Sequence, residues 1–315
     1  MQPAYSHDSG KPELEKDGSC GRFTMKLVGA TTRAGLRNIL MAIDFSPSSD
    51  AALDYAVAIA RRYGSRIYMT HVIRPDVYQL VSPEAMETVL DQARHYAEQQ
   101  MAKVLVSGRI RGVPHQVLLG QGELWTVFSQ LIEEHEIDLI VVGTHGRTGL
   151  KKMLMGSVAE RVFRMAPCPV LTVGPRVPLD AVKRRGPRQI LYATDFSATA
   201  EGAAGYALSL AQEHRSNLSL LHVLEGDRFD PVKAAAAENR LKSLVPPGDE
   251  LCCSPEFHVV SGHPADEILK TAGELNADLI VLGVRHPDFS ISQLPPATAY
   301  KVVCSAHCPV LTIRG

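Results

Sequence analysis

The chain has 315 residues, of which 45% are hydrophobic and 21% charged, with a formal net charge of −1. This length predicts about two domains, each large enough to bury its own core. The balanced charge gives no basic footprint for nucleic acid or for an acidic membrane surface, and no apolar run is long enough to span a membrane. We therefore expect no nucleic-acid partner and no membrane partner.

The N-terminal segment and the cysteines indicate the compartment. Residues 1–35 mix Asp, Glu and Lys without the apolar core of a secretory signal, so we expect a flexible leader. Six cysteines in this length do not form a disulfide scaffold. Cys304 and Cys308 flank His307, but no second ligand pair lies nearby, which favours a structural role over metal binding. These features predict a reduced, cytoplasmic protein.

In the first half of the chain, short apolar runs alternate with helical patterns. The first helix has apolar residues at positions 53, 56, 57 and 60, which form one helical face. Further helices are expected from Pro83 to Val106, around 124–131, and from Ser157 to Met165. Strands are expected at 39–43, 67–72, 115–119, 139–142 and 170–173. Strands that alternate with helices predict a parallel, doubly wound α/β sheet.

The second half repeats the first. The sequence ILMAIDFS at 39–46 returns as ILYATDFS at 190–197, DLIVVG at 138–143 as DLIVLG at 278–283, and CPVLTV at 168–173 as CPVLTI at 308–313. The offset between copies falls from 151 to 140, so the second copy is about eleven residues shorter between its second and fourth strands. We expect its strands at 190–193, 218–223, 256–260, 279–282 and 310–313. Domains are predicted at 36–175 and 188–315, with a Pro-rich, basic linker at 176–187.

A glycine pattern, Gly143-x2-Gly146-x9-Gly156-Ser157, follows the fourth strand of the first half. Glycines allow sharp turns and close approach of a ligand to the backbone. Gly156 and Ser157 open a helix, whose free N–H groups and dipole suit phosphate. The alternative is structural: Ser157-x-x-Glu160 fits a capping box, and glycines also serve turns alone.

Asp44 has two readings. It ends a strand and precedes Ser46-Pro47, a helix-start signal, so its carboxylate can bind a ligand or cap the turn. Asp195 holds the same position in the second half, where the glycine pattern is missing, and this favours a structural role for Asp44.

The second half lacks the glycine pattern, because His286-Pro287 and Pro295-Pro296-Ala297 stand at its positions. Proline removes N–H donors, so we do not expect this loop to bind phosphate. His145, inside the first loop, has no recognisable catalytic partner. The residues of this loop therefore give little support to an enzymatic function.

Together, the Asp-Phe-Ser turn after the first strand, the His71-Val72 strand end, the glycine pattern and the closing Pro169-Val-Leu-Thr-Val resemble the universal stress protein family. The resemblance is full over 36–175 and degenerate over 188–315. It implies two tandem five-stranded parallel α/β sheets of the adenine-nucleotide hydrolase-like type, and ATP as ligand, with Mg or Mn held through the phosphates. It implies that Gly143 lies against the ribose and that the phosphates meet Gly146, Gly156, Ser157 and Val158. Ala42, Asp44 and Val72 would border the adenosine.

The resemblance also implies pairing through the final strands, 169–173 and 309–313, whose apolar edges favour it. We expect the halves to pair within one chain as a pseudo-twofold unit, and a homodimer of two chains stays open. Three functions remain as hypotheses: an ATP-binding regulatory or stress-response protein, an interaction module without nucleotide, and a slow ATPase.

Overall fold

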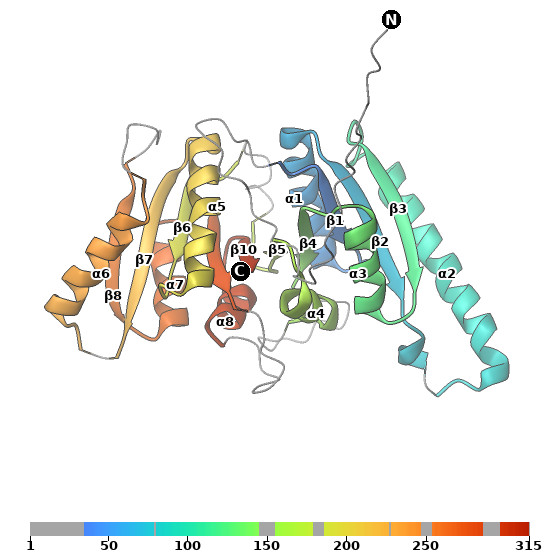
Figure 1. Cartoon of the computed structure of the whole chain (residues 1–315). Helices are drawn as coiled ribbons and strands as arrows, with labels where there is room; N and C mark the ends of the chain where they lie inside the picture. Colours follow the sequence, from blue (N-terminus) through green and yellow to red (C-terminus); the bar gives the residue numbers. More distant parts are fainter. Residues whose placement is uncertain are drawn as a thin grey trace, which may run out of the picture.

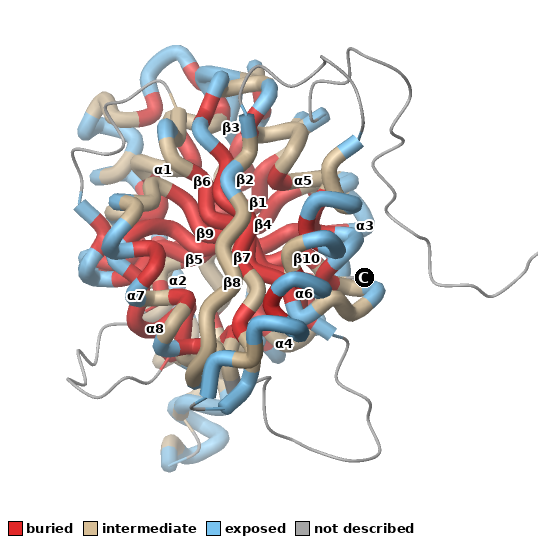
Figure 2. Tube along the Cα trace, turned by 90° about the vertical axis from the view of Figure 1, so that its left-hand side faces the viewer, coloured by how far each residue is buried: buried red, intermediate tan, exposed pale blue. Residues whose placement is uncertain are grey.

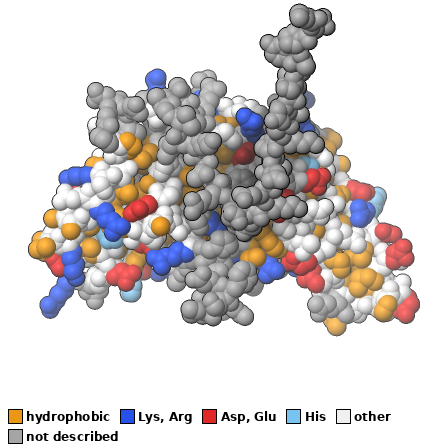
Figure 3. All heavy atoms as spheres, in the orientation of Figure 1, with side chains coloured by type: hydrophobic (Ala, Val, Ile, Leu, Met, Phe, Trp, Pro, Cys, Tyr) orange, Lys and Arg blue, Asp and Glu red, His pale blue; other side chains and the backbone are white. Residues whose placement is uncertain are grey.

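The computed structural model describes residues 35–78, 80–144, 155–178, 186–226, 228–246, 254–285 and 297–314. Figure 1 shows two similar halves side by side, the first in blue and green and the second in yellow and red, which meet at strands β5 and β10 in the centre. On the face drawn in Figure 3, acidic and basic side chains both occur, as the net charge of −1 suggests. Of the helices that the structure describes, none combines the length and apolar character of a membrane-spanning segment.

The first half follows the order predicted from the sequence. Its first helix begins after Ser46, whose side chain accepts a hydrogen bond from the backbone N–H of Ser49, and ends at Gly64 with a left-handed φ of 71°. The elements are β1 (Asn38–Ala42), α1 (Pro47–Tyr63), β2 (Arg66–Ile73), the 3-10 turn η1 (Pro75–Tyr78), α2 (Pro83–Val106), β3 (His115–Gln121), α3 (Leu124–Glu134), β4 (Leu139–Gly143), α4 (Ser157–Met165) and β5 (Val170–Val173).

The second half repeats this order. Its elements are β6 (Gln189–Ala193), α5 (Ala198–His214), β7 (Asn217–Glu225), α6 (Pro231–Ser243), β8 (Glu256–Gly262), α7 (Pro264–Glu274), β9 (Leu279–Val284), α8 (Ala297–Ser305) and β10 (Val310–Arg314). Helix α2 has 24 residues and α6 has 13, a difference of 11. The shortening found in the sequence is therefore taken up mainly by this helix.

The ten strands form one sheet in the order β3-β2-β1-β4-β5-β10-β9-β6-β7-β8. Neighbours within each half are parallel, and β5 and β10 pair antiparallel. The predicted fold class, two tandem parallel five-stranded α/β units, is confirmed, and the two sheets continue into one another.

The pairing of β5 and β10 is symmetric. Leu171 lies opposite Leu311 in the ladder. Thr172 Oγ1 donates to the carbonyl oxygen of Val310 at 3.1 Å, and Thr312 Oγ1 donates to that of Val170 at 3.3 Å. Equivalent residues thus make equivalent contacts, as in a twofold dimer interface.

Helices cover both faces of the sheet, and the strands between them form the buried centre in Figure 2. One apolar cluster lies under α1, α2, α5 and α6, and the other lies under α3, α4, α7 and α8. Each cluster includes residues of both halves, so the core is continuous across the β5–β10 ladder.

Three cysteines, Cys168, Cys304 and Cys308, are buried thiols. Burial raises the pKa of Cys168 and of Cys308 to about 12, so both stay protonated and unreactive near neutral pH. Among the described residues no group of three or more His, Cys, Asp or Glu could hold a metal ion.

Candidate functional site

The candidate site lies where the strand order reverses. From β1 the chain continues to β2 on one side, and β4 lies on the other side. In open α/β sheets, ligands bind beyond the carboxyl ends of the strands at this point. Ala42 ends β1, Val72 lies near the end of β2, and Gly143 ends β4. The backbone N–H of Gly156 donates to the carbonyl oxygen of Thr144 at 2.7 Å, which brings the start of α4 to the same edge.

Seven of the eight predicted nucleotide contacts are therefore in the described part of the chain, at this edge: Ala42, Asp44, Val72, Gly143, Gly156, Ser157 and Val158. Gly146 lies outside the described residues, and so does His145.

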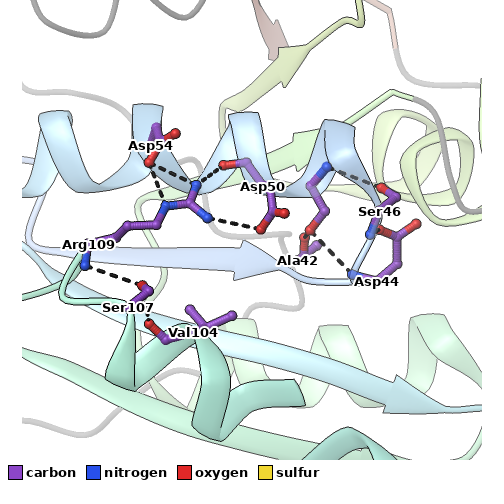
Figure 4. A network of polar contacts seen from close by, with 9 residues as sticks. Ala42, Asp44, Ser46, Asp50, Asp54, Val104, Ser107 and Arg109 are labelled. Carbon is purple, nitrogen blue, oxygen red and sulfur yellow. Dashed lines mark hydrogen bonds and ion pairs between the residues drawn. The ribbon is translucent and has the colours of Figure 1, made fainter.

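Asp44 forms part of the turn from β1 into α1 (Figure 4). Its Oδ1 accepts the backbone N–H of Ser46 at 3.0 Å. Ser49 Oγ accepts the backbone N–H of Asp44 at 3.4 Å and donates to the carbonyl oxygen of Ala42 at 3.5 Å. In the second half, Asp195 Oδ1 accepts the backbone N–H of Ser197 at 2.9 Å. One carboxylate oxygen thus supports the turn in both halves, which is the capping role considered from the sequence.

The residue after each aspartate adopts a left-handed backbone. Phe45 has a φ of 62°, an uncommon value for a bulky residue, and its ring lies 4.7 Å from that of His71. His71 Nδ1 lies 2.7 Å from the carbonyl oxygen of Ile43. Phe196 repeats this with a φ of 58° and a ring distance of 4.3 Å from His222. Because both halves hold the same conformation, it belongs to the fold rather than to one ligand site.

Gly143 is required by packing against α1. A Cβ at this position would lie 2.6 Å from the carbonyl carbon of Ser48 and 2.8 Å from the backbone nitrogen of Ser49. At Gly283 a Cβ would lie 2.5 Å from Cα of Ala200, in the first turn of α5. The first glycine of the pattern is thus present in both halves because a helix passes close to it. The sequence alone predicts only a turn and the close approach of a ligand at this glycine.

The N-terminus of α4 has no side-chain cap. Gly156 is the N-cap residue, with φ −63° and ψ 150°, and Ser157 is the first helical residue. The capping-box alternative for Ser157 and Glu160 is therefore wrong, and Glu160 pairs instead with Arg164 at 2.8 Å. The first-turn backbone N–H groups of α4, and the positive end of its dipole, lie at the site edge.

Arg74, just beyond β2, was not identified from the sequence. Its Nη1 donates to Ser157 Oγ at 3.5 Å, and its Nε lies 3.9 Å from Asp76 Oδ1. The offset of 151 places Glu225 at the equivalent position of the second half. Comparing charges at this offset is the signal that would have found Arg74.

Helix α4 is held at both ends by the second half. The hydroxyl of Tyr300, on α8, accepts the backbone N–H of Met155 at 3.1 Å, just before the helix. Arg314, on β10, donates to the carbonyl oxygens of Phe163 and Arg164 in its last turn. Burial lowers the pKa of Arg314 to about 10, so it remains a cation at neutral pH, which suits a helix C-terminus.

The second half has a cleft at the equivalent place, with a volume of about 530 Å³. Arg285 Nη2 lies 3.2 Å from Asp195 Oδ2 across it. Burial opposes the charge of Asp195, but the hydrogen bonds from Ser197 and the Arg285 guanidinium outweigh it and hold the pKa of Asp195 below its usual value. The predictions for His286, Pro287, Pro295 and Pro296 fall outside the described residues, and Ala297 begins α8.

Comparison with known protein families finds the same family model in each half of the chain. The model of the universal stress protein family matches residues 35–174 and again residues 187–314. The chain belongs to the universal stress protein family. Two matches in one chain make it a tandem member, as the sequence predicted.

Two similar proteins match less than half of this chain, and a third matches most of it. Universal stress protein YxiE of Bacillus subtilis is 32% identical over 143 residues, which are 43% of this chain and 97% of YxiE. A universal stress protein of Methanocaldococcus jannaschii is 32% identical over 140 residues, 44% of this chain and 81% of that protein. The crystal structure of a universal stress protein from Archaeoglobus fulgidus covers 88% of this chain and 98% of its own, with a TM-score of 0.66 and 21% identity, which shows the shared fold.

The packing of α1 and α5 on the sheet leads to a stability prediction. We expect Gly143→Ala and Gly283→Ala each to lower the free energy of unfolding by about 1–3 kcal/mol, because backbone atoms of a helix must move. Gly202→Ala and Gly273→Ala are matched controls, since nothing lies within 4 Å of a Cβ at either helical position. Urea unfolding without nucleotide measures all four variants. Wild-type stability of both Gly143→Ala and Gly283→Ala would contradict the packing requirement.

Proposed function

We propose that this universal stress protein is a regulatory protein that binds ATP in the cleft of its first half. The observation that carries the proposal is the pairing of Arg74 with the uncapped N-terminus of α4 at the switch-point edge. A guanidinium and a row of backbone N–H groups are the donors that phosphate prefers. The second half has Glu225 and Ala297 at the positions of Arg74 and Ser157.

In this proposal the ligand lies across the ends of β1, β2 and β4. Ala42, Asp44 and Val72 border the adenosine, and the backbone of Gly143 lies against the ribose. Gly146, Gly156, Ser157 and Val158 receive the phosphates. A Mg or Mn ion would be held through the phosphates.

We also propose that the protein works in the cytoplasm with its two halves paired within one molecule. Strands β5 and β10 occupy each other's edges. A homodimer would therefore use a different surface from the one that joins the halves.

The first test is ATP titration of the wild type, Gly156→Val and Asp195→Ala, followed by measurement of phosphate release. Valine puts a branched side chain at the N-cap where the phosphates are expected, and we expect it to weaken ATP binding by about 10-fold or more. Asp195→Ala, in the second cleft, should bind ATP like the wild type.

Each other result of this titration identifies a different function. Equally poor ATP binding by the wild type and Gly156→Val would favour an interaction module without nucleotide. Phosphate release that scales with protein and disappears in Gly156→Val would make the protein a slow ATPase.

The second test concerns the charge of Arg74. We expect Arg74→Gln to weaken ATP binding by about 5- to 10-fold, because one charge-assisted contact to phosphate is lost, and to leave adenosine binding unchanged. Glu225→Gln, the same kind of change at the equivalent position, is the control and should leave ATP affinity unchanged. The loss should shrink at high salt. An equal loss for adenosine and ATP would show that Arg74 does not act on the phosphates.

The third test asks whether the second half positions α4. We expect Tyr300→Phe to weaken ATP binding by about 3-fold, since the backbone N–H of Met155 loses its acceptor and the start of α4 loosens. Tyr206→Phe, which removes a hydroxyl from α5 on the opposite face of the sheet, is the control. ATP affinity and urea unfolding are measured for both. Unchanged affinity in Tyr300→Phe would leave the contact without a role in binding.

A further inference from the structure

Another cavity, larger than the cleft of the second half, lies between the two halves. It is at the opposite ends of the strands from the candidate nucleotide site. Its volume is about 890 Å³. It is bounded by α1 and α5 and by the amino-terminal ends of the central strands, whereas the candidate nucleotide site lies beyond their carboxyl ends. Its apolar wall includes three residues and their counterparts in the repeat: Tyr55, Leu139 and Leu171 from the first half, and Tyr206, Leu279 and Leu311 from the second.

Hydrogen-bond contacts join the C-terminal ends of α1 and α5 beside the cavity. Arg62 Nη2 donates to the carbonyl oxygen of Glu213 at 3.3 Å, and the hydroxyl of Tyr63 lies 3.0 Å from His214 Nε2. These are equivalent positions of the repeat, so the contact lies close to the pseudo-twofold axis. Burial raises the pKa of Tyr63 above its usual value, and the carboxylate of Glu213 adds to the effect, so the hydroxyl keeps its proton.

The two acidic side chains of the cavity wall, Asp54 and Asp278, both have hydrogen-bond partners. The carboxylate of Asp54 binds Arg109 at 2.8 Å, as Figure 4 shows. The carboxylate of Asp278 accepts the backbone N–H groups of Arg188 and Gln189 at 2.9 and 3.2 Å. Both acidic groups of the wall are thus engaged.

The guanidinium groups of Arg61 and Arg62 bind carbonyl oxygens, whereas that of Arg109 binds two carboxylates. Arg61 Nη2 donates to the carbonyl oxygens of Arg109 and Arg111 at 2.8 and 3.3 Å, and Arg62 donates to a carbonyl oxygen as well. Within the described ranges no carboxylate lies within 4 Å of either guanidinium. The rim therefore presents positive charge beside an apolar interior.

We propose that this cavity binds an amphipathic small-molecule anion. Its apolar body lies between Tyr55 and Tyr206 over the β5–β10 ladder, and its anionic group lies at Arg61 and Arg62. The volume falls in the range of small-molecule pockets, about 300–1,000 Å³, which are mostly apolar with a few polar groups that fix orientation. The site is independent of the proposed ATP site.

Two fluorescent probes with one ring system test this proposal on the full-length protein. 8-Anilinonaphthalene-1-sulfonate carries an anionic sulfonate, and N-phenyl-1-naphthylamine is the same molecule without it. We expect both to bind with a stoichiometry of one. Ala58→Trp, on the cavity wall, should reduce the affinity of both probes at least 10-fold because the indole fills the space. Ala235→Trp, at an exposed position of α6, is the matched control and should have no effect.

The charge arm uses Arg61→Gln combined with Arg62→Gln. We expect this variant to bind the sulfonate probe about 10-fold more weakly and the uncharged probe as before, which also shows that the cavity is intact. Saturating ATP should displace neither probe. Three results would overturn the proposal. The first is an equal effect of Ala58→Trp and Ala235→Trp, and the second is no difference between the probes in the arginine variant. The third is that the probes bind only when Phe23→Asp and Leu27→Asp have changed two apolar residues of the N-terminal segment. The last result would assign the cavity to the chain's own N-terminal segment.

Discussion

The antiparallel ladder between β5 and β10 is the interaction on which the molecule depends. It joins two five-stranded sheets into one and makes two apolar clusters continuous across both halves. Because Thr172 and Thr312 repeat each other's hydrogen bonds, the halves meet as the subunits of a twofold dimer would. The geometry brings α4 against α8 and β10 on one face, and α1 against α5 on the other. Both candidate sites follow from these juxtapositions.

Repetition within the chain separates what the fold needs from what a ligand would need. Gly143 and Gly283 both lie under the first turn of a helix, and Asp44 and Asp195 both support a turn. Features that serve the fold are therefore present twice. At the carboxyl edge the halves differ, because Glu225 and Ala297 stand at the positions of Arg74 and Ser157 in the alignment of the repeat. Charge and N–H donors, rather than strand ends, distinguish the two clefts.

The strands of both halves and the helices of the first half could be predicted because each is a local apolar pattern, and the repeat shows each strand a second time in the sequence itself. The eleven missing residues correspond to a shorter helix, which periodicity alone did not locate. The role of Gly143 could not be predicted, because the clash that excludes a side chain involves Ser48, nearly a hundred residues earlier. The predicted capping box is wrong for a local reason. Gly156 is the N-cap residue, so Ser157 is already the first residue of the helix and cannot cap it.

The position of α4 offers a physical reason to retain a second half whose own loop departs from the family pattern. A helix of nine residues is too short to be stable by itself, so its start is defined only as well as its tertiary contacts define it. Tyr300 holds the chain just before it, and Arg314 neutralises the partial negative charge of its last carbonyl groups. Both residues come from the second half, and position 174, equivalent to Arg314, is a glycine in the first. The N–H groups proposed to receive phosphate are thus oriented by residues of the other half, so that a single cleft depends on both copies of the repeat.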